Sequence, residues 1–318
     1  MHAIETRELT KYYGNLCAVD HLSLSVDREI FGLLGPNGSG KTTTVLMLTT
    51  LLTPSDGKGM VCGYDVVRDG REIRKKISYV PQDMAVDIKL TGRENVVFFA
   101  RLYGVPEPEK RAEEVLAVME LSDRADDLVR TYSGGMRCRL ELAQALVHNP
   151  DVLFLDEPTI GLDVAARKKI WEHIHALKEQ GMTIFVTTHY MDEANQFCDR
   201  VEIINKGKIV ALGTPPDLKA RLMRDIVTVK SDGECPDPDL PGITRVNAEN
   251  GETVFAAENG KAAIPLLADA LKSRGITVQE MSLREPTLDD VFLQAVGNQE
   301  EPEGFDYDKF RIMLRRRK

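Results

Sequence analysis

The segment EIFGLLGPNGSGKTTTVLM at residues 29–47 decides the fold, because it joins an apolar run to a helical one through a glycine-rich turn. Residues 30–34 have the character of a buried strand, and residues 41–48 continue as a helix. Between them, Gly35 and Gly40 bound a turn that can adopt conformations closed to other residues. The backbone N–H groups of this turn and of the helix start form a donor surface that suits phosphate. The sequence therefore predicts a phosphate-binding loop.

Two side chains strengthen this prediction. Lys41 adds a positive charge beside the phosphates, and Thr42 places a hydroxyl where it can ligate a bridging Mg²⁺. With the two glycines they complete the pattern G-x-x-x-x-G-K-[ST]. An ordinary strand, turn and helix with a chance lysine would also fit these residues. The strand before the turn and the helix after it favour the phosphate loop.

Length and charge limit the classes of function. With 318 residues the chain exceeds one average domain, so we expect a larger domain and a small second one. Lys and Arg total 41 against 50 Asp and Glu, which gives a net charge of -9. An acidic chain with few aromatic residues is a poor nucleic-acid binder. We therefore expect no nucleic-acid partner and a nucleotide as the source of the phosphate.

The cysteines and the apolar runs indicate the compartment. Five cysteines are widely spaced without a C-x-x-C pair, and the first residues contain no apolar signal segment, as expected for a reduced cytosolic protein. No run approaches 18 apolar residues, so we expect nothing in this chain to span a bilayer. A membrane role would then need a partner chain.

Residues 3–28 alternate apolar and polar positions, which predicts antiparallel strands ahead of the phosphate loop. Tyr12 and Tyr13 are expected in the turn between these strands. An aromatic ring there can stack on an adenine ring or simply pack against its neighbours, and the sequence leaves both open.

Between the phosphate loop and residue 149 the pattern changes from strand to helix. Residues 53–57 predict a turn, and residues 59–64 and 77–80 predict strands, with Gln82 just after the second of them. From about residue 83 to residue 149 the spacing is helical, which predicts a helical insertion.

The helical insertion contains recognisable helix starts. Thr91 and Glu94 form a capping box, and residues 108–121 carry apolar side chains on one face. Ser133 is a good N-cap for a helix at residues 137–149 and is followed by two glycines, so a second set of free N–H groups is expected there. Taken alone, this pattern also fits an ordinary capped helix.

Residues 151–157, DVLFLDE, form an apolar run typical of a parallel strand covered on both faces, but the run ends in two acids. Ligands of open α/β sheets bind at such strand ends. There Asp156 can reach Mg²⁺, and Glu157 can face the water that attacks the γ-phosphate. Without the phosphate loop the pair would fit a helix entry signal equally well, and with it we favour the catalytic interpretation.

The rest of the first domain supplies one more candidate. Asp163 opens a helix at residues 164–180, and a strand at residues 183–188 ends at His189, which can contact a γ-phosphate and the attacking water. A hairpin at residues 201–213 follows. We interpret the other histidines as surface or packing residues, namely His2, His21, His148, His173 and His175.

In this order the motifs resemble the ATP-binding cassette of ABC transporters, an α/β phosphate-loop NTPase fold with a mixed sheet core, an antiparallel β piece and a helical subdomain. The resemblance implies a cassette at residues 1–222 with its helical subdomain at about 83–149. Its specificity lies in the signature at residues 133–136, just ahead of the acidic strand.

The resemblance also assigns roles to individual residues. Those implied for nucleotide binding are Tyr13, Gly35, Pro36, Asn37, Gly38, Ser39, Gly40, Lys41, Thr42, Thr43, Ser133, Gly134, Gly135 and Asp163. Those implied for Mg²⁺ are Thr42, Gln82 and Asp156, and those implied for catalysis are Glu157 as general base, His189, Gln82 and Asp156.

Two positions depart from the family's common L-S-G-G-Q signature, with Tyr132 in place of leucine and Met136 in place of glutamine. The Ser-Gly-Gly core is kept, so contact with a γ-phosphate is still expected, whereas a role for the glutamine side chain is in doubt. The resemblance further implies a head-to-tail dimer of two ATP-binding chains, in which Ser133 and Gly135 of one chain close over the ATP of the other.

Residues 223–298 predict a small α+β domain, with Thr287 and Asp290 as a capping box near its end. The expected elements are strands at 226–230, 253–257 and 276–283 and a helix at 263–274. The ending REPTLDDVFLQ resembles the C-terminal domain of daunorubicin-resistance-type ATPases, which implies an ABC-2 type exporter of a drug, antibiotic or lipid-like molecule. Residues 299–318 are expected to be a flexible charged tail.

Together these patterns predict the ATP-hydrolysing subunit of an ABC-2 type exporter, which binds ATP and Mg²⁺. We expect it in the cytoplasm, held on the inner face of the cell membrane by a separate ABC-2 type permease. A soluble ABC ATPase that acts on ribosomes or nucleic acid is the main alternative, and the single cassette, the lack of long coiled-coil heptads and the acidic balance count against it. A second alternative is a regulatory nucleotide-binding module that hydrolyses little ATP. The complete set of catalytic candidates argues against this alternative.

Overall fold

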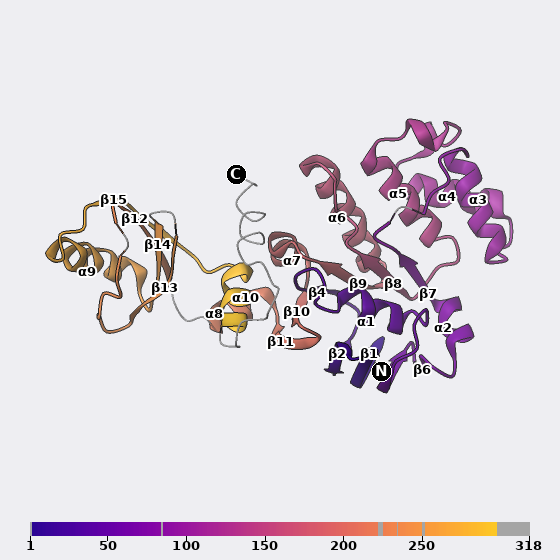
Figure 1. The fold of residues 1–318 in the computed structure, drawn as a ribbon. Coiled ribbons are helices and arrows are strands. Elements are labelled where there is room, and N and C mark those ends of the chain that lie inside the picture. The colour runs from indigo at the N-terminus through magenta and orange to yellow at the C-terminus, as the bar shows by residue number, and fades with distance from the viewer. Residues whose placement is uncertain (1, 84, 222–224, 234, 250–251, 298–318) are drawn as a thin grey trace. The chain divides into compact units, whose positions relative to one another are not determined.

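The protein folds into two compact units (Figure 1), the first ending at Thr214 and the second beginning at Pro215. Each unit has its own hydrophobic core. None of the helices described is both long and apolar enough to cross a membrane. The computed structural model describes residues 2–83, 85–221, 225–233, 235–249 and 252–297.

A six-stranded sheet forms the centre of the first unit. Its order is β11-β10-β4-β9-β8-β7, and neighbouring strands are parallel except for β11, which is antiparallel to β10. Every residue of β4, β8 and β9 is buried, as expected for parallel strands covered on both faces. The strands are β4 (Ile30–Leu34), β7 (Ile77–Val80), β8 (Val152–Asp156), β9 (Thr183–Thr188), β10 (Arg200–Asn205) and β11 (Lys208–Gly213).

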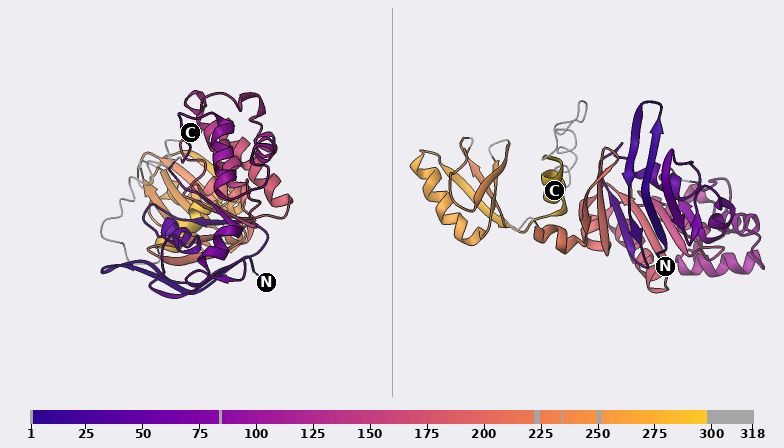
Figure 2. Two further views of the ribbon diagram at one scale, coloured as in Figure 1. Left: turned by 90° about the vertical axis from the view of Figure 1, so that its right-hand side faces the viewer. Right: turned by 90° about the horizontal axis from the view of Figure 1, so that it is seen from below.

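The predicted antiparallel strands form a second sheet of order β2-β1-β5-β6, with β3 paired to β1. Figure 2 shows β1 and β2 in indigo as a long hairpin. Helix α1 (Lys41–Leu48) contacts β2 and β5 of this sheet and β8 of the central sheet, so the main core lies between the two sheets around α1. The strands are β1 (Ile4–Tyr13), β2 (Leu16–Leu22), β3 (Ser25–Val26), β5 (Asp56–Val61) and β6 (Tyr64–Asp65).

Two details of this sheet differ from the sequence prediction. Tyr12 and Tyr13 do not lie in the turn but are the last residues of β1, and the chain turns at Gly14, where φ is 58°. The predicted strand at 59–64 is two strands, because the chain turns at Cys62, whose φ of 52° is incompatible with a strand.

Helices occupy most of residues 92–145, as predicted. The Thr91 and Glu94 capping box is present, since each residue's side chain accepts the backbone N–H of the other. Helix α5 begins at Gly134 rather than at residue 137, because the Ser133 hydroxyl accepts the N–H of Met136 and brings both signature glycines into the first turn. The helices of the first unit are α2 (Gly70–Lys76), α3 (Gly92–Leu102), α4 (Pro108–Val118), α5 (Gly134–Ala145), α6 (Val164–Glu179) and α7 (Met191–Phe197), with short 3-10 turns at Ser122–Arg124 and Val129–Thr131.

The second unit is an antiparallel sheet of order β13-β14-β12-β15 whose core packs against α9. The predicted strands, helix and Thr287–Asp290 capping box are present, whereas β13 was not predicted. Helix α8 groups with this unit because it contacts α10, so the boundary lies at Thr214 and not at residue 222. The predicted tail at 299–318 lies outside the described residues. The elements are α8 (Pro215–Arg221), β12 (Asp225–Ser231), β13 (Ile243–Glu249), β14 (Glu252–Ala257), α9 (Gly260–Ser273), β15 (Val278–Arg284) and α10 (Leu288–Gly297).

Candidate active site

The carboxyl ends of three neighbouring strands meet at one edge of the central sheet. Strand β9 lies between β4 and β8 and is parallel to both, and Asp156 at the end of β8 pairs with Thr187 of β9. The phosphate loop after β4, His189 after β9 and Glu157 after β8 therefore leave the sheet at the same edge. This strand order brings together residues that are more than 100 positions apart in the sequence.

Two glycines of the phosphate loop are required by close backbone contacts. Gly40 caps α1 with φ of 109°, and a Cβ atom there would lie 2.5 Å from the carbonyl oxygen of Ala18. A Cβ atom at Gly35 would lie 2.2 Å from the carbonyl oxygen of Ile204. Ser39 Oγ in this loop is buried and has no hydrogen-bond partner in the described part of the chain. A buried hydroxyl of this kind needs a partner, and a phosphate oxygen would supply one.

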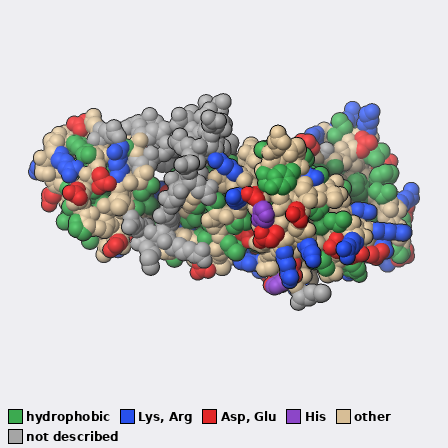
Figure 3. All heavy atoms as spheres, turned by 60° about the horizontal axis from the view of Figure 1, so that its bottom comes forward, with side chains coloured by type: hydrophobic (Ala, Val, Ile, Leu, Met, Phe, Trp, Pro, Cys, Tyr) green, Lys and Arg blue, Asp and Glu red, His purple; other side chains and the backbone are tan. Residues whose placement is uncertain are grey.

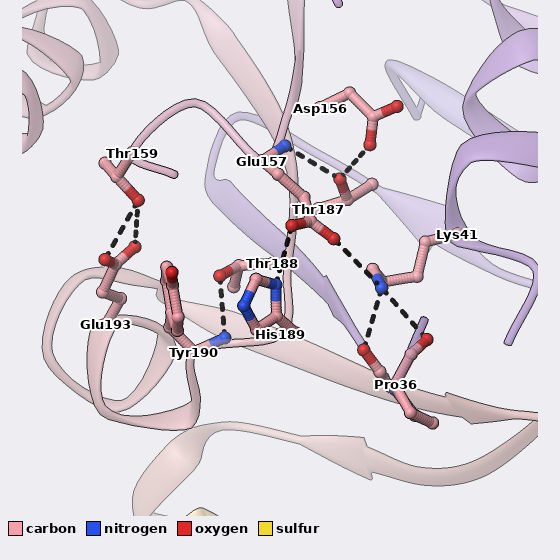
Figure 4. Close-up of polar contacts among 11 residues, drawn as sticks. Pro36, Lys41, Asp156, Glu157, Thr159, Thr187, Thr188, His189, Tyr190 and Glu193 are labelled. Atoms are coloured by element: carbon pink, nitrogen blue, oxygen red, sulfur yellow. Dashed lines mark hydrogen bonds and ion pairs between the residues drawn. The ribbon is translucent and has the colours of Figure 1, made fainter. Parts of the chain in front are cut away.

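Lys41 is buried directly beside this loop. Its Nζ donates to the carbonyl oxygens of Gly35 at 2.8 Å and Pro36 at 3.2 Å and lies 3.3 Å from Oε1 of Glu157 (Figure 4). Burial lowers the pKa of Lys41, and the nearby carboxylate of Glu157 opposes that shift. The ammonium group thus depends on anions close by, as a phosphate-binding lysine does.

Glu157 joins Lys41 to His189. Its Oε2 lies 2.7 Å from Nδ1 of His189, while its Oε1 faces Lys41. Burial alone would raise the pKa of Glu157, but the hydrogen bond to His189 and the charge of Lys41 hold it below its usual value. The carboxylate is therefore ionised at neutral pH and can accept a proton. Glu157 also has φ of 52°, an unusual backbone conformation that is often found at functional sites.

Thr187 positions both acids. Its hydroxyl donates to Oδ1 of Asp156, and its carbonyl oxygen accepts the backbone N–H of Glu157 at 3.1 Å. The hydroxyl of Tyr79 on β7 lies 3.5 Å from the other carboxylate oxygen of Asp156. Thr187 is not among the predicted site residues, although a hydroxyl near the end of an apolar strand was a signal that could have identified it.

The residues expected to hold Mg²⁺ fit an ion that also binds phosphate. Thr42 is exposed in the first turn of α1, Gln82 is exposed after β7, and Asp156 is buried at the end of β8. In the described ranges, no group of three or more His, Cys, Asp or Glu side chains could hold a metal. Mg²⁺ at nucleotide sites takes one or two carboxylates with waters and phosphate oxygens, so these donors suit it.

The signature forms the exposed start of α5. Ser133 is the N-cap, and a Cβ atom at Gly135 would lie 2.8 Å from Cβ of Ala166 on α6, so a glycine is needed where the two helices meet. Asp163 caps α6 through the N–H of Ala166 at 2.8 Å. The signature, through Gly135, and the side chain of Asp163 therefore both lie against Ala166.

The replacement of leucine by Tyr132 is accommodated within the fold. Tyr132 is buried, and its hydroxyl donates to the carbonyl oxygen of Arg124 at 2.6 Å. The phenol oxygen is thus paired, which removes the cost of burying a polar atom. The departure at this position does not disturb the helix start at Ser133.

Not all predicted site residues come together. Tyr13 is 47% exposed, with Lys11 Nζ 5.5 Å from its ring centre. Among the residues described, Glu157 is joined to Lys41 by an ion pair and to His189 by a hydrogen bond, and neither kind of contact joins these three residues to Tyr13, Gln82, Ser133 or Asp163.

A second polar cluster adjoins the site, and none of its residues was predicted as a site residue. Glu193 of α7 is buried and accepts hydrogen bonds from Thr159 and Trp171. Nothing in the spacing of these residues marks them as neighbours, because they lie on three separate segments.

Comparisons with known proteins agree with this geometry. Residues 19–160 match the model of the ABC transporter family, and residues 213–296 match that of the C-terminal domain of DrrA1-3-like ATP-binding proteins. The daunorubicin resistance ATP-binding protein DrrA3 of Streptomyces coeruleorubidus is 40% identical over 93% of this chain and 96% of its own length. The linearmycin resistance ATP-binding protein LnrL of Bacillus subtilis is 37% identical over 92% and 98%.

The first unit is also similar in fold to a solved ATP-binding cassette. A dimeric ATP-binding cassette in a post-hydrolysis state, bound to ADP and phosphate, is 28% identical, covers 66% of this chain and 98% of its own, and has a TM-score of 0.61. The catalytic candidates and the phosphate loop described above lie in the part of the chain that has this fold. The chain therefore belongs to the ATP-binding subunits of ABC transporters, in the daunorubicin-resistance group, and is an ATPase.

Proposed function

We propose that this chain is the ATP-hydrolysing subunit of an ABC-2 type exporter and couples closure of an ATP-bound dimer to separate membrane subunits. The position of Glu157 supports the catalytic part, since its two carboxylate oxygens contact Lys41 and His189 at the sheet edge. An ionised carboxylate there can take a proton from the water that attacks the γ-phosphate.

Lys41 has two competing partners in this scheme. In the structure it pairs with Glu157, whereas a γ-phosphate in the loop would offer it a more highly charged anion. When Lys41 turns to the phosphate, Glu157 loses its ion pair and becomes a better proton acceptor. His189 keeps its hydrogen bond to Glu157 and orients the carboxylate.

Mg²⁺, when bound, neutralises charge on the phosphates during transfer. Thr42, Gln82 and Asp156 are the residues that would hold it. The hydrogen bond from Thr187 fixes the Asp156 carboxylate for this task.

Two copies of the chain are proposed to form a dimer with two ATP sites, each built from residues of both copies. The N–H groups at the start of α5 favour an anion, and both Ser133 and Gly134 are exposed. The phosphate loop already uses the N-terminus of α1 of its own chain. The start of α5 is therefore available to a nucleotide held by a second copy, in a head-to-tail dimer.

A groove beside the helical insertion is the proposed contact with the permease. It has a volume of about 540 Å³, and Leu102, with 68% of its surface exposed, lines it together with the basic side chains of Arg71 and Arg74. A surface groove that exposes large apolar side chains such as Leu102 commonly marks an interaction site. Contact here would place the chain in the cytoplasm, held at the inner face of the cell membrane by the permease.

The names of the relatives support an export substrate of the drug, antibiotic or lipid-like class. DrrA3 is named for daunorubicin resistance and LnrL for linearmycin resistance. Both match this chain over more than 90% of its length, including the second unit. We extend the substrate class to this chain on that basis.

Reconstitution with a six-helix ABC-2 permease tests this proposal. ATP hydrolysis in proteoliposomes should rise when the permease is present, and Leu102→Glu should remove the rise without changing the basal rate. Val118→Glu is the matched control, because Val118 is an exposed apolar residue of the same helical insertion that does not line the groove. Equal effects of the two substitutions would contradict the assigned surface.

The alternative function, action on ribosomes or nucleic acid, predicts a different result. Figure 3 shows acidic and basic side chains interspersed on the face drawn there, without the basic stripe that phosphate backbones attract. We expect no salt-sensitive affinity for duplex DNA or RNA in a gel shift. Tight binding that weakens steeply with salt would support the alternative.

A further inference from the structure

A buried carboxylate next to the proposed catalytic site joins three segments of the chain. Glu193 lies in the first turn of α7, and its side chain is 2% exposed. Thr159 Oγ1 donates to its two oxygens at 2.7 and 3.0 Å, as Figure 4 shows, and Trp171 Nε1 donates to Oε2 at 3.3 Å. Arg167 Nε forms an ion pair with Oε1 at 3.1 Å.

One of these partners belongs to the loop that follows Glu157. The N–H of Ile160 donates to the carbonyl oxygen of Glu157 at 3.2 Å, and the N–H of Leu162 donates to that of Thr159 at 3.2 Å. The loop from Glu157 to Asp163 is therefore compact, and the Thr159 hydroxyl binds it to Glu193.

The other two partners lie on α6, which Asp163 caps. Arg167 also contacts a second residue, since its guanidinium lies 5.0 Å from the ring centre of Tyr190. The Tyr190 ring in turn lies 4.0 Å from the ring of His189. The segment that carries His189 is thus connected to α6 by Arg167 and by Glu193.

Stability alone does not explain a carboxylate at this position. Burial raises the pKa of Glu193, and the hydrogen bond from Thr159 and the charge of Arg167 oppose that shift. Buried ion pairs are often no more stabilising than well-packed apolar side chains of similar volume. A carboxylate that accepts hydrogen bonds from Thr159 and Trp171 and pairs with the charge of Arg167 does, however, fix the relative positions of the segments that supply these groups.

We propose that Glu193 is a positioning residue for ATP hydrolysis, which holds the loop from Glu157 to Asp163 and the start of α7 in a single arrangement. In that arrangement His189 faces Glu157, and Asp163 keeps its place at the start of α6. The inference rests on the proposed roles of Glu157 and His189. Among the described residues, the hydrogen bonds and the ion pair of Glu193 do not involve the phosphate loop, so its effect falls on turnover and not on ATP binding.

Steady-state kinetics of Glu193→Ala test this role. We expect kcat to fall about tenfold or more, because a small displacement of catalytic groups is costly, while the KM for ATP stays within about twofold. Glu193→Gln keeps an oxygen that can accept from Thr159 and Trp171, so it should retain more activity than Glu193→Ala.

Substitutions of Thr159 give a second readout. Thr159→Val removes only the hydroxyl and should lower kcat, whereas Thr159→Ser keeps the hydroxyl and should restore most of it. In a double-mutant cycle, Thr159→Val should add little to Glu193→Ala, because both remove the same hydrogen bonds. Independent, additive losses would contradict the proposal.

Glu202→Ala is the control for truncation of a buried glutamate. Glu202 on β10 is as deeply buried as Glu193, and within the described part of the chain it forms no hydrogen bond with Glu157, Thr159 or His189. All rates are divided by the folded fraction from thermal unfolding. A loss of kcat in Glu202→Ala equal to that in Glu193→Ala would overturn the proposal in favour of general destabilisation.

Two further outcomes separate this inference from the proposed function. Full kcat in Glu193→Ala together with an inactive Glu157→Gln would overturn the inference alone. Normal turnover by Glu157→Gln would overturn the assigned base and with it the basis of the inference. A raised KM at unchanged kcat in Glu193→Ala would assign the residue to ATP binding and would also contradict its role in turnover.

Discussion

The two units of this chain differ in what they bury. In the first unit, Lys41, Glu157, His189 and Glu193 are buried, and Glu157 contacts both Lys41 and His189 at one sheet edge. In the described residues of the second unit, the buried polar side chains are those of Ser231 and Thr253, and the core is apolar. Burying charge is costly unless each group is paired. We infer that the buried charged groups of the first unit serve catalysis, whereas the buried side chains of the second unit serve to stabilise its fold.

This difference has a consequence for how the units respond to mutation. In the first unit, a substitution that keeps the shape of a side chain can abolish turnover, because the charges act on substrate. In the second unit, even a large change in the core should act on folding alone. Substitutions in each unit can break or sharpen this contrast.

The largest expected effect is on turnover at the sheet edge. Glu157→Gln should lower steady-state hydrolysis by about 10² to 10⁴-fold while ATP still binds, because a general base is lost. Lys41→Ala should weaken ATP binding itself, because the charge beside the phosphates is lost. Calorimetry with ATP and a phosphate-release assay measure the two effects. Unchanged affinity in Lys41→Ala, or normal hydrolysis by Glu157→Gln, would contradict the assigned roles.

The second prediction concerns the exposed helix start at Ser133. Ser133→Arg should block hydrolysis by preventing dimer closure, while binding to the phosphate loop stays nearly intact. Mixing inactive Ser133→Arg with inactive Lys41→Ala should restore part of the activity, since a heterodimer assembles one site from two sound halves. Normal hydrolysis by Ser133→Arg alone would mean that the first unit works without a partner copy.

The third prediction separates buried charge from catalysis within the first unit. Burial raises the pKa of Glu202 to about 8, and its Oε2 has no hydrogen-bond partner in the part of the chain described. Below the carboxyl's unfolded pKa of about 4.3 both states hold the proton, and from there to about pH 8 the unfolded state loses it first. The carboxyl therefore destabilises the fold increasingly as pH rises through this window.

The glutamine in Glu202→Gln cannot titrate, so this substitution should remove the pH dependence of stability that Glu202 causes. Urea unfolding at pH 5 and at pH 8 should show the variant gaining free energy of unfolding relative to the wild type as pH rises, by about 1 kcal/mol or more. Hydrolysis by the folded variant should be unchanged. A constant difference between the two proteins across this pH range would show that the carboxyl does not titrate there.

The smallest effect on turnover is expected in the second unit. Phe255 is fully buried in its core, and Phe255→Ala should destabilise that unit by about 3 to 5 kcal/mol. Hydrolysis by the isolated chain should stay within about twofold of the wild type if the units unfold separately. Calorimetry would follow the two transitions. A large loss of hydrolysis with an intact first transition would show that the second unit takes part in the chemistry.

Several features of this protein could be predicted from the sequence because their signals are local. The phosphate loop with Lys41, the capping box at Thr91 and the acidic end of β8 each depend on residues within a few positions of one another. Local spacing fixes which backbone groups are free and which side chains share a face. For the same reason Ser133 and Asp163 could be recognised as helix caps, and the structure confirms both.

Other features were decided only by the tertiary structure. Thr187 and Glu193 are ordinary residues in the sequence, and they gain their roles because the strand order β4-β9-β8 brings separate segments together. Strand β13 was not predicted, although the β-branched residues Ile243, Thr244 and Val246 favour a strand, and its pairing with β14 became visible only in the fold. Helix α8 belongs to the second unit because it packs on α10, more than 60 residues later. Such contacts depend on the whole fold, because burial and pairing are set by residues that lie far away in the chain.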